Sequence, residues 1–271
     1  MNAHSLIRNK FNIACPACKT GRVTLKFDNV YCMDCGASFP IKNGVIDLLH
    51  GSTLEKSPAQ SFMDREWLIK IYESRLWRKN PIFYFLMGIT FKGELDLILQ
   101  VLNLERDETL LDLACGPGIY TRPFAKKLSN GAVVGLDLSM PILDYAVKKA
   151  QSEGIKNCVF VHGDALQLPF PDNQFDAVNC CGALHLFPYP EVIQGITRIL
   201  KPGGCFTVAA AKMPDMGPMV RKIRDWYQRN AGVKGFSFHE LVELLEKGGL
   251  TRVECHHKKH WWLIMSGMKP Q

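Results

Sequence analysis

An apolar run that ends in an acid and a glycine turn is the feature that most constrains the fold of this chain. Residues 110–118 read Leu-Leu-Asp-Leu-Ala-Cys-Gly-Pro-Gly, and a second acid, Asp137, lies 25 positions after the first. Such a run predicts a buried strand that leads to a ligand, because Gly116 and Gly118 lack Cβ and permit a tight turn. Asp137 ends the next apolar run, 133–136, where a carboxylate can accept hydrogen bonds from a ribose diol. Together these features predict a nucleoside site.

The residues around the turn distinguish between nucleoside cofactors. A dinucleotide site needs a third small residue, but that position holds Thr121, after the bulky Ile119 and Tyr120. Asp112 would also repel a pyrophosphate. S-adenosylmethionine (SAM) carries a sulfonium, an ammonium and a ribose but no phosphate. The sequence therefore favours SAM over a nicotinamide cofactor.

Several segments, in this order over residues 109–211, resemble the class I SAM-dependent methyltransferase family. They are residues 110–118, 135–139 (Gly-Leu-Asp-Leu-Ser), 162–165 (His-Gly-Asp-Ala), 168–170 with 175–178, and 200–204 (Leu-Lys-Pro-Gly-Gly). The chain is most similar to the methyltransferase type 11, or ubiquinone–menaquinone-like, branch. The resemblance implies that the glycine loop holds the methionine part of SAM, Asp137 the ribose, and Met140 and Asp164 the adenine. The cofactor-binding residues implied are Asp112, Ala114, Gly116, Gly118, Asp137, Leu138, Met140, Asp164, Ala165 and Asn179.

The order of apolar segments predicts an α/β fold, a doubly wound sheet with helices between most strands. Further strands are expected at 133–137, 158–162, 175–180, 205–210, 250–256 and 260–266. The resemblance implies a seven-stranded Rossmann-like sheet whose last strand inserts antiparallel. The expected domains are a zinc ribbon (1–50), a linker and helical cofactor-covering region (51–103), and a methyltransferase domain (104–271) with a lid insertion at about 212–238. Helices are expected over 61–79 and 81–103. The resemblance implies that they lie over the cofactor, where Tyr84, Phe85 and other aromatic side chains would form a dry roof that excludes water.

Two Cys-x-x-Cys pairs near the start of the chain form the second strong motif. Cys15 and Cys18 are separated by thirteen residues from Cys32 and Cys35, which is typical of a structural zinc ribbon. Residues 22–27 and 29–31 alternate enough to form a hairpin between the pairs. Four thiolates complete a tetrahedron, so the Zn²⁺ is expected to be structural rather than catalytic. The other cysteines are expected to be small core residues, although Cys180 and Cys181 end a strand where substrate is expected.

Charge and composition narrow the class of protein further. The formal net charge is +7, and basic residues predominate outside 93–211, which leaves an anionic partner such as RNA open. No apolar run approaches the ~20 residues that span a bilayer. The first eleven residues are polar and mixed, unlike a secretory signal, so a reducing, cytoplasmic location is expected.

The segment after the strand at 175–180 is expected to select the substrate. His185 is a candidate general base, since its ordinary pKa lies near neutrality, or a residue that only shapes the pocket. Residues 182–185 (Gly-Ala-Leu-His) resemble enzymes that act on small quinone, sterol or phenolic acceptors, so a small-molecule methyltransferase is predicted. The alternatives are a ribosomal RNA guanine-N1-type methyltransferase that binds RNA through its ribbon, and a non-catalytic cofactor-binding or zinc-dependent interaction protein. The oligomeric state is not predicted.

Overall fold

The fold is described from a computed structural model that covers residues 6, 9–19, 21–52, 80–187, 189–212 and 235–271. Its sheet contains eleven strands in the order β1-β2-β3-β4-β7-β6-β5-β8-β9-β11-β10. The strands are β1 (Val23–Lys26), β2 (Asn29–Cys32), β3 (Ser38–Lys42), β4 (Val45–Asp47), β5 (Thr109–Leu113), β6 (Ala132–Asp137), β7 (Cys158–His162), β8 (Phe175–Cys181), β9 (Leu200–Ala211), β10 (Thr251–Lys259) and β11 (Trp262–Met268). The helices are α4 (Pro81–Met87), α5 (Phe91–Leu102), α6 (Thr121–Lys127), α7 (Met140–Ser152), the 3₁₀ helix η1 (Leu184–Leu186), α8 (Tyr189–Ile199) and α10 (Phe238–Lys247).

Seven of these strands, β7-β6-β5-β8-β9-β11-β10, reproduce the expected doubly wound arrangement. Strands β5 to β9 are parallel to their neighbours, and β11 inserts antiparallel between β9 and β10. The strand that contains Cys205 already begins at Leu200, and its pairing with β8 is interrupted between Phe175 and Ala177. The expected strands and the antiparallel last strand are therefore confirmed, with shifts of the strand ends.

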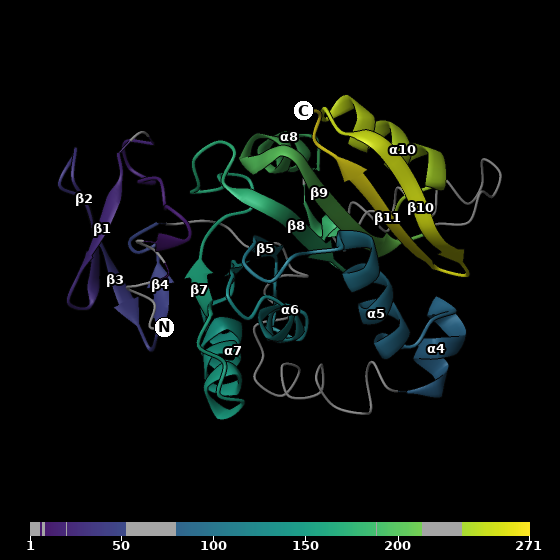
Figure 1. The fold of residues 1–271 in the computed structure, drawn as a ribbon, viewed down its shortest axis with the longest axis horizontal. Coiled ribbons are helices and arrows are strands. Elements are labelled where there is room, and N and C mark those ends of the chain that lie inside the picture. The colour runs from purple at the N-terminus through teal and green to yellow at the C-terminus, as the bar shows by residue number, and fades with distance from the viewer. Residues whose placement is uncertain (1–5, 7–8, 20, 53–79, 188, 213–234) are drawn as a thin grey trace.

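The sheet is larger and more mixed than the sequence predicts. Strand β3 is antiparallel to β4, and β4 pairs in parallel with β7, so the N-terminal strands extend the main sheet rather than forming a separate unit. Figure 1 shows the N-terminal strands at one end of the sheet and the β10–β11 hairpin at the other. The prediction of a seven-stranded sheet with a detached ribbon was therefore incomplete.

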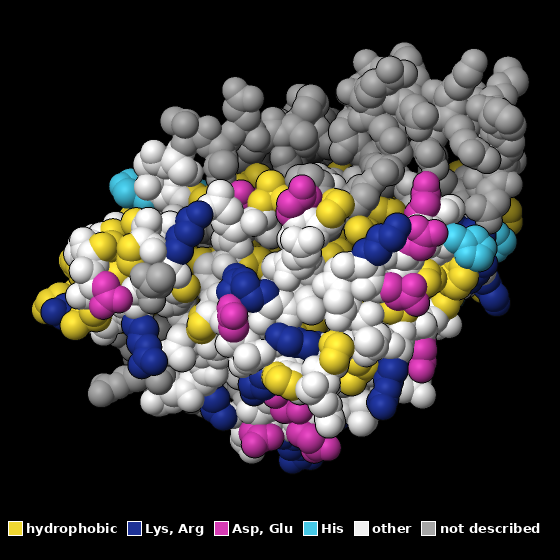
Figure 2. Space-filling model, turned by 90° about the horizontal axis from the view of Figure 1, so that it is seen from above, with side chains coloured by type: hydrophobic (Ala, Val, Ile, Leu, Met, Phe, Trp, Pro, Cys, Tyr) yellow, Lys and Arg dark blue, Asp and Glu magenta, His cyan; other side chains and the backbone are white. Residues whose placement is uncertain are grey.

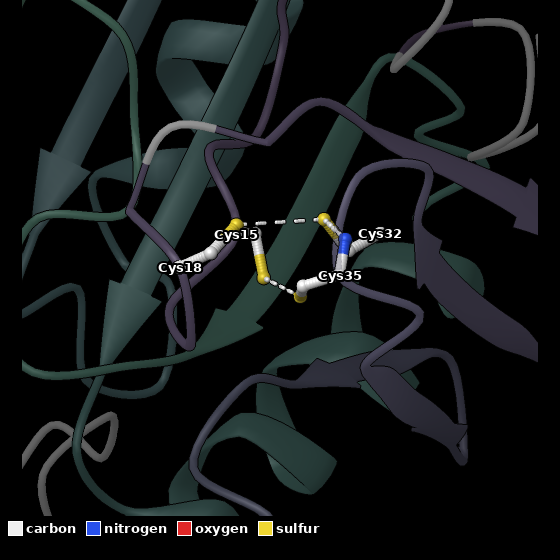
Figure 3. Close-up of side chains that lie close together, drawn as sticks. All are labelled: Cys15, Cys18, Cys32 and Cys35. Atoms are coloured by element: carbon white, nitrogen blue, oxygen red, sulfur yellow. Dashed lines mark hydrogen bonds between the residues drawn. The ribbon is translucent and has the colours of Figure 1, made fainter.

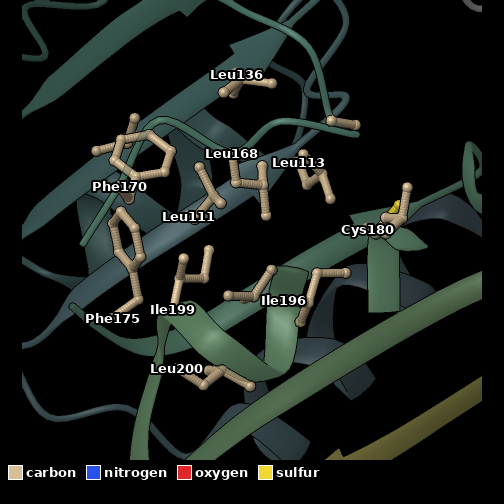
Figure 4. Packing of buried hydrophobic residues seen from close by; sticks show 14 of the residues in the cluster. Leu111, Leu113, Leu136, Leu168, Phe170, Phe175, Cys180, Ile196, Ile199 and Leu200 are labelled. Atoms are coloured by element: carbon tan, nitrogen blue, oxygen red, sulfur yellow. The ribbon is translucent and has the colours of Figure 1, made fainter. Parts of the chain in front are cut away.

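Helices cover both faces of the sheet because alternate strand residues point to opposite sides. Leu110 packs with Ile98 of α5 and Phe124 of α6, whereas Leu111 packs with Ile196 of α8 and the rest of the larger core. Figure 4 shows part of that larger core, where Phe170 and Phe175 meet edge to face at a centroid distance of 5.0 Å. Both faces are covered by closely packed apolar side chains, so the sheet holds the residues at its carboxyl edge in fixed positions.

The region before β5 differs from the prediction. One helix over 81–103 was expected, but α4 and α5 are separate because Gly88 has a φ of +69° and a Cβ there would meet His260 at 2.8 Å. Tyr84 and Phe85 are 53% and 73% exposed, so these two side chains do not form a dry roof. The helix expected over 61–79 and most of the lid lie outside the described residues. Lys212 and Phe236, at the two ends of that lid, form a bridge.

The helices and the charged side chains of the described residues bear on how the protein meets its surroundings. Among the helices in the described ranges, none has the length and apolarity to cross a membrane. Figure 2 shows basic and acidic side chains interspersed over one face rather than gathered by sign. This face therefore presents no large field of a single charge.

Candidate functional site

The loop after β5 has an unusual backbone. Ala114, Gly116 and Gly118 have φ values of +52°, +54° and +74°. A Cβ at Gly116 would meet nothing within 4 Å, whereas one at Gly118 would touch Ala146 and Phe160 at 3.4 Å. Gly116 therefore borders open space that a ligand can enter, and Gly118 lets the loop pack closely. Ala114 pays a cost of about 1–2 kcal/mol for its left-handed conformation, a kind of strain that is concentrated at functional sites.

Hydrogen bonds fix this loop against β6 and α6. The Gly116 amide donates to one carboxylate oxygen of Asp137 at 2.8 Å, and the Ser139 amide donates to the other at 2.9 Å. Arg122 donates to the Pro117 carbonyl at 2.8 Å and pairs with Glu153 at 2.8 Å. A carboxylate oxygen can accept more than one hydrogen bond, so these backbone contacts do not by themselves prevent Asp137 from accepting from a ribose hydroxyl.

Asp112 lies buried beneath the loop and accepts hydrogen bonds from two neutral side chains. It accepts from Thr121 Oγ1 at 2.6 Å and from Asn179 Nδ2 at 2.8 Å, and Thr207 Oγ1 donates to the amide oxygen of Asn179 at 3.0 Å. Burial raises the pKa of Asp112 to about 6, although both hydrogen bonds act in the opposite direction. A carboxylate in this position gains from a cationic ligand, which would restore its charged form.

The other residues of the expected cofactor site lie at the same edge. Leu138 and Met140 follow β6, and Asp164 and Ala165 follow β7. Directly after β7, the Gly163 amide donates to the carbonyl of Asp137 at 3.0 Å. Carboxyl ends of adjacent parallel strands meet at one edge, where doubly wound proteins bind ligands. Asn179 differs from its neighbours, because it is 0% exposed and contacts Asp112 from below. Its observed role is to support Asp112.

His185 lies on η1, directly after β8. Its Nδ1 is buried and has no hydrogen-bond partner among the described residues. Burial lowers the pKa of His185 to about 4, so the imidazole is neutral near pH 7. A neutral imidazole with so low a pKa is a weak base, but it can still form a hydrogen bond with a bound substrate.

Sequence reasoning missed the polar residues that support this edge from neighbouring elements. Glu94 of α5 is 1% exposed and accepts from Cys181 Sγ at 3.1 Å and from Trp262 Nε1 at 2.9 Å. The spacing of Glu94, Ile98 and Leu102, one face of a helix, was a signal that this acid points inward. Arg122 and Thr121 left no comparable pattern.

The cysteine at the end of β8 is not suited to nucleophilic attack. Cys180 is 0% exposed, and burial raises its pKa well above the ordinary value. It packs in the larger core with Leu184. The prediction that the cysteines outside the ribbon are core residues is confirmed for Cys115, Cys180, Cys181 and Cys205, which are buried. Cys158 is half-buried against the core, and Cys255 is exposed.

The four predicted metal ligands come together in the N-terminal module (Figure 3). The sulfur atoms of Cys15, Cys18, Cys32 and Cys35 all lie within 4.8 Å of one another. The Cys15–Cys35 and Cys18–Cys32 sulfur distances are both 3.7 Å, and a tetrahedron with Zn–S bonds of 2.3 Å has edges of about 3.8 Å. All four are free thiols. The donor set therefore fits a tetrahedral Zn²⁺.

The backbone around the cysteines is built for such a cluster. The Gly21 amide donates to Cys18 Sγ at 3.3 Å, and the Cys35 amide donates to Cys32 Sγ at 3.5 Å. A Cβ on Gly21 would clash with the sulfur of Cys32, and Gly36 has a φ of +75°. Glycine is therefore required at both positions for different reasons.

A parallel α/β sheet with a glycine loop and acids at its carboxyl edge defines a nucleoside-binding protein of the Rossmann-like class. Residues 110–204 match the family model of a methyltransferase domain. The chain is 31% identical over 188 residues to the demethylmenaquinone methyltransferase of Bacillus licheniformis, which covers 59% of this chain and 78% of that enzyme. The chain thus belongs to the class I SAM-dependent methyltransferase family, and it is a SAM-dependent methyltransferase.

Solved structures with lower identity share the fold. The phosphoethanolamine N-methyltransferase 2 of Haemonchus contortus in complex with SAM has a TM-score of 0.63 and 17% identity, covering 96% of this chain and 71% of that one. A SAM-dependent methyltransferase of Aquifex aeolicus has a TM-score of 0.54 and 22% identity, covering 70% of this chain and 93% of that one. At these identities the likeness is one of architecture.

Proposed function

We propose that this enzyme transfers the methyl group of SAM to a small-molecule acceptor with a quinone-like or phenolic ring. Support comes from its relationship to demethylmenaquinone methyltransferases, at 31% and 30% identity for two Bacillus enzymes. Further support comes from residues 179–182 (Asn-Cys-Cys-Gly), which lack the prolines of enzymes that methylate exocyclic amines of nucleic-acid bases.

The proposed SAM site consists of the loop and the strand ends at one edge of the sheet. Gly116 and Ala114 would hold the methionine part near Asp112, Asp137 would bind the ribose, and Leu138, Met140, Asp164 and Ala165 would line the adenine. The fit rests on the open space at Gly116 and on Asp112, whose charged form gains from a cation. SAM supplies a methyl group on a positively charged sulfur. The protein contributes alignment of the acceptor and exclusion of water.

The single observation that carries the acceptor assignment is the buried, unpartnered Nδ1 of His185. Leaving such a nitrogen without a partner costs about 1–3 kcal/mol, which an acceptor hydroxyl can recover. The low pKa of His185, about 4, keeps the ring neutral. His185 is therefore proposed to orient the acceptor by a hydrogen bond and not to act as a strong base.

The proposal is tested with labelled SAM and two kinds of acceptor. Demethylated naphthoquinols should be methylated, whereas ribosomal RNA transcripts should not. His185→Leu should lower kcat/KM for the quinol by about tenfold, or about 1.4 kcal/mol. Thr197→Val is the matched control, since Thr197 Oγ1 is also buried without a partner but lies in α8. Methylation of RNA alone would favour the alternative of a ribosomal RNA enzyme.

We also propose that residues 1–50 form a structural module around one Zn²⁺ bound by Cys15, Cys18, Cys32 and Cys35. In the absence of metal, burial raises the pKa of Cys15 to about 12, so metal binding should release protons. Elemental analysis should find one zinc per chain, and a chelator should lower the melting temperature. Cys255→Ser, at an exposed cysteine outside the module, should keep the metal, whereas Cys15→Ser should lose it. Full metal content in Cys15→Ser would contradict the site.

A further inference from the structure

The last strand of the N-terminal module brings a buried acid to the main sheet. Strand β4 pairs in parallel with β7, and Asp47 is the direct partner of His162 in that register. Asp47 is 3% exposed, and His162 Nδ1 lies 2.7 Å from its Oδ1. Lys42 donates to the other oxygen of Asp47 at 2.9 Å. The module is thus joined to the main sheet by strand pairing and by a buried side-chain hydrogen bond between His162 and Asp47.

The second nitrogen of His162 continues this contact toward the proposed cofactor site. His162 Nε2 lies 3.1 Å from the carbonyl oxygen of Leu138. A carbonyl can only accept, so Nε2 donates to it. Asp137 precedes Leu138 and is the register partner of His162 on β6. A continuous path therefore runs from the module through Asp47 and His162 to the backbone next to the proposed ribose ligand.

The charges of this contact are satisfied within the protein. Burial on its own would raise the pKa of Asp47, but hydrogen bonds and positive charge from His162 and Lys42 hold it below the usual value. Asp47 is therefore a carboxylate that accepts from the ring, and this fixes the orientation of His162. Such outer contacts commonly set the geometry of groups that bind a ligand directly.

We propose that Asp47 and His162 are positioning residues for the adenosine part of SAM, and that the N-terminal module thereby sets the affinity for the cofactor. The inference rests on the proposed cofactor site at Asp137 and Leu138. The segment after β6 is short and leads directly into α7, whose N-cap is Ser139. Its Leu138 carbonyl is held by a side chain, so loss of that hydrogen bond frees the backbone that must face the adenosine. An ordered site binds more tightly because less ordering is left to the ligand.

The test measures affinity for S-adenosylhomocysteine by calorimetry in the full chain. Asp47→Asn should weaken binding about fivefold to twentyfold and raise KM for SAM, while kcat at saturating SAM and KM for the acceptor stay near wild type. A purely structural contact would lower stability without changing the affinity of the folded protein. Equal affinity of wild type and a folded Asp47→Asn would overturn the proposal.

Two substitutions of His162 separate its two hydrogen bonds. The amide nitrogen of glutamine takes the place of Nε2 and can still donate to Leu138, whereas that of asparagine takes the place of Nδ1 and can only reach Asp47. His162→Gln should therefore retain more affinity than His162→Asn. The reverse order would contradict the role of the Leu138 contact, even if Asp47→Asn failed to fold.

Ile46→Val is the matched control for the junction, the contact between β4 and β7 at Asp47 and His162. Ile46 neighbours Asp47 on β4, is 0% exposed and packs in the larger core without joining the polar path. It should lower stability by about 1 kcal/mol and leave affinity unchanged. Failure of the wild type and the Ile46→Val control to bind would count against the proposed cofactor site itself. Normal binding by both, with no change in the Asp47 and His162 variants, would count only against the positioning role.

Discussion

The junction with the N-terminal module and the glycine-loop edge each contain a buried carboxylate, but the pKa of the two groups is shifted in opposite directions. At the junction, Asp47 has Lys42 and His162 as partners, and its pKa is lowered. Under the loop, Asp112 has only neutral side-chain donors, and burial raises its pKa to about 6. The first acid has its positive partners within the protein, whereas the second is proposed to face the cation of a bound cofactor.

His185 extends this comparison to a base. Burial lowers its pKa to about 4, so the substrate-facing edge favours the neutral forms of both an acid and a base. Perturbed groups without an internal counter-charge are typical of binding sites, while paired groups are typical of structural contacts. The presence or absence of an internal counter-charge thus distinguishes side chains that stabilise the fold from those proposed to contact a ligand.

The largest effect is expected for Asp112→Asn. Asparagine keeps an oxygen for Asn179 and an amide that can donate to Thr121, but it carries no charge. Affinity for SAM should fall about a hundredfold, or about 3 kcal/mol, as expected for loss of a buried charged contact. Calorimetric titration measures the affinity. Asp96→Asn, at an exposed ion pair of α5, is the control and should bind normally.

Stability of the same variant should change in the opposite direction. Because the pKa of Asp112 is higher in the fold, its stabilising contribution is present at low pH and is lost as pH rises through about 6. At pH 8 the apo Asp112→Asn protein should thus be more stable than wild type by up to about 3 kcal/mol. Urea unfolding at pH 5 and pH 8 measures the difference. A variant that is less stable at both pH values would remove the contrast with Asp47.

His185→Leu should reduce the fall in the free energy of unfolding that occurs as pH is lowered below about 6.5. The unfolded chain binds a proton at His185 below about pH 6.5, whereas the folded protein resists until pH falls to about 4. Wild-type stability should therefore drop by up to about 3 kcal/mol between these values, and the variant should lose less. Urea unfolding at pH 7 and pH 4.5 gives the slopes. Thr197→Val should show the wild-type slope, and identical slopes in all three proteins would contradict the burial of His185.

Asp47→Asn should destabilise the protein where Asp112→Asn does not. At pH 7 the expected loss is about 2 kcal/mol, because Lys42 and His162 lose the carboxylate charge to which they are hydrogen-bonded. Since the pKa of Asp47 is lowered in the fold, its contribution is present above the unfolded value of about 3.8 and disappears as pH falls further. The gap between wild type and variant should therefore narrow only as pH falls below about 3.8. Lys42→Met, at a half-exposed partner, should cost less than about 1 kcal/mol.

The contrast also shows what the sequence could and could not predict. The strands β5 to β9 were found because each apolar run ends in a turn or an acid with a recognisable position. The metal ligands followed from the spacing of four cysteines. Both signals are local, and both depend on residues close together in the chain.

The junction was missed because its signal is not local. Strand β4 has three residues, too few for any alternation, and its partner β7 is more than a hundred residues away. Asp47 on its own reads as the polar end of a hairpin, and only pairing with β7 buries it beside His162. The break at Gly88 has a similar origin, since it depends on contact with Lys259 and His260. Tertiary contacts decided both features.

The smallest effect is expected in the proton balance of cofactor binding. If a cation binds near Asp112, the carboxyl must ionise, so binding below about pH 6 should release up to one proton and weaken about tenfold per pH unit. Titrations at pH 5.5 in two buffers of different ionisation enthalpy count the protons. Asp47→Asn should show the same release, because Asp47 is already ionised at that pH, and Asp112→Asn should show none. If Asp112→Asn still released a proton, the proton would come from another group. The proposed difference between Asp112 and Asp47 would then be contradicted.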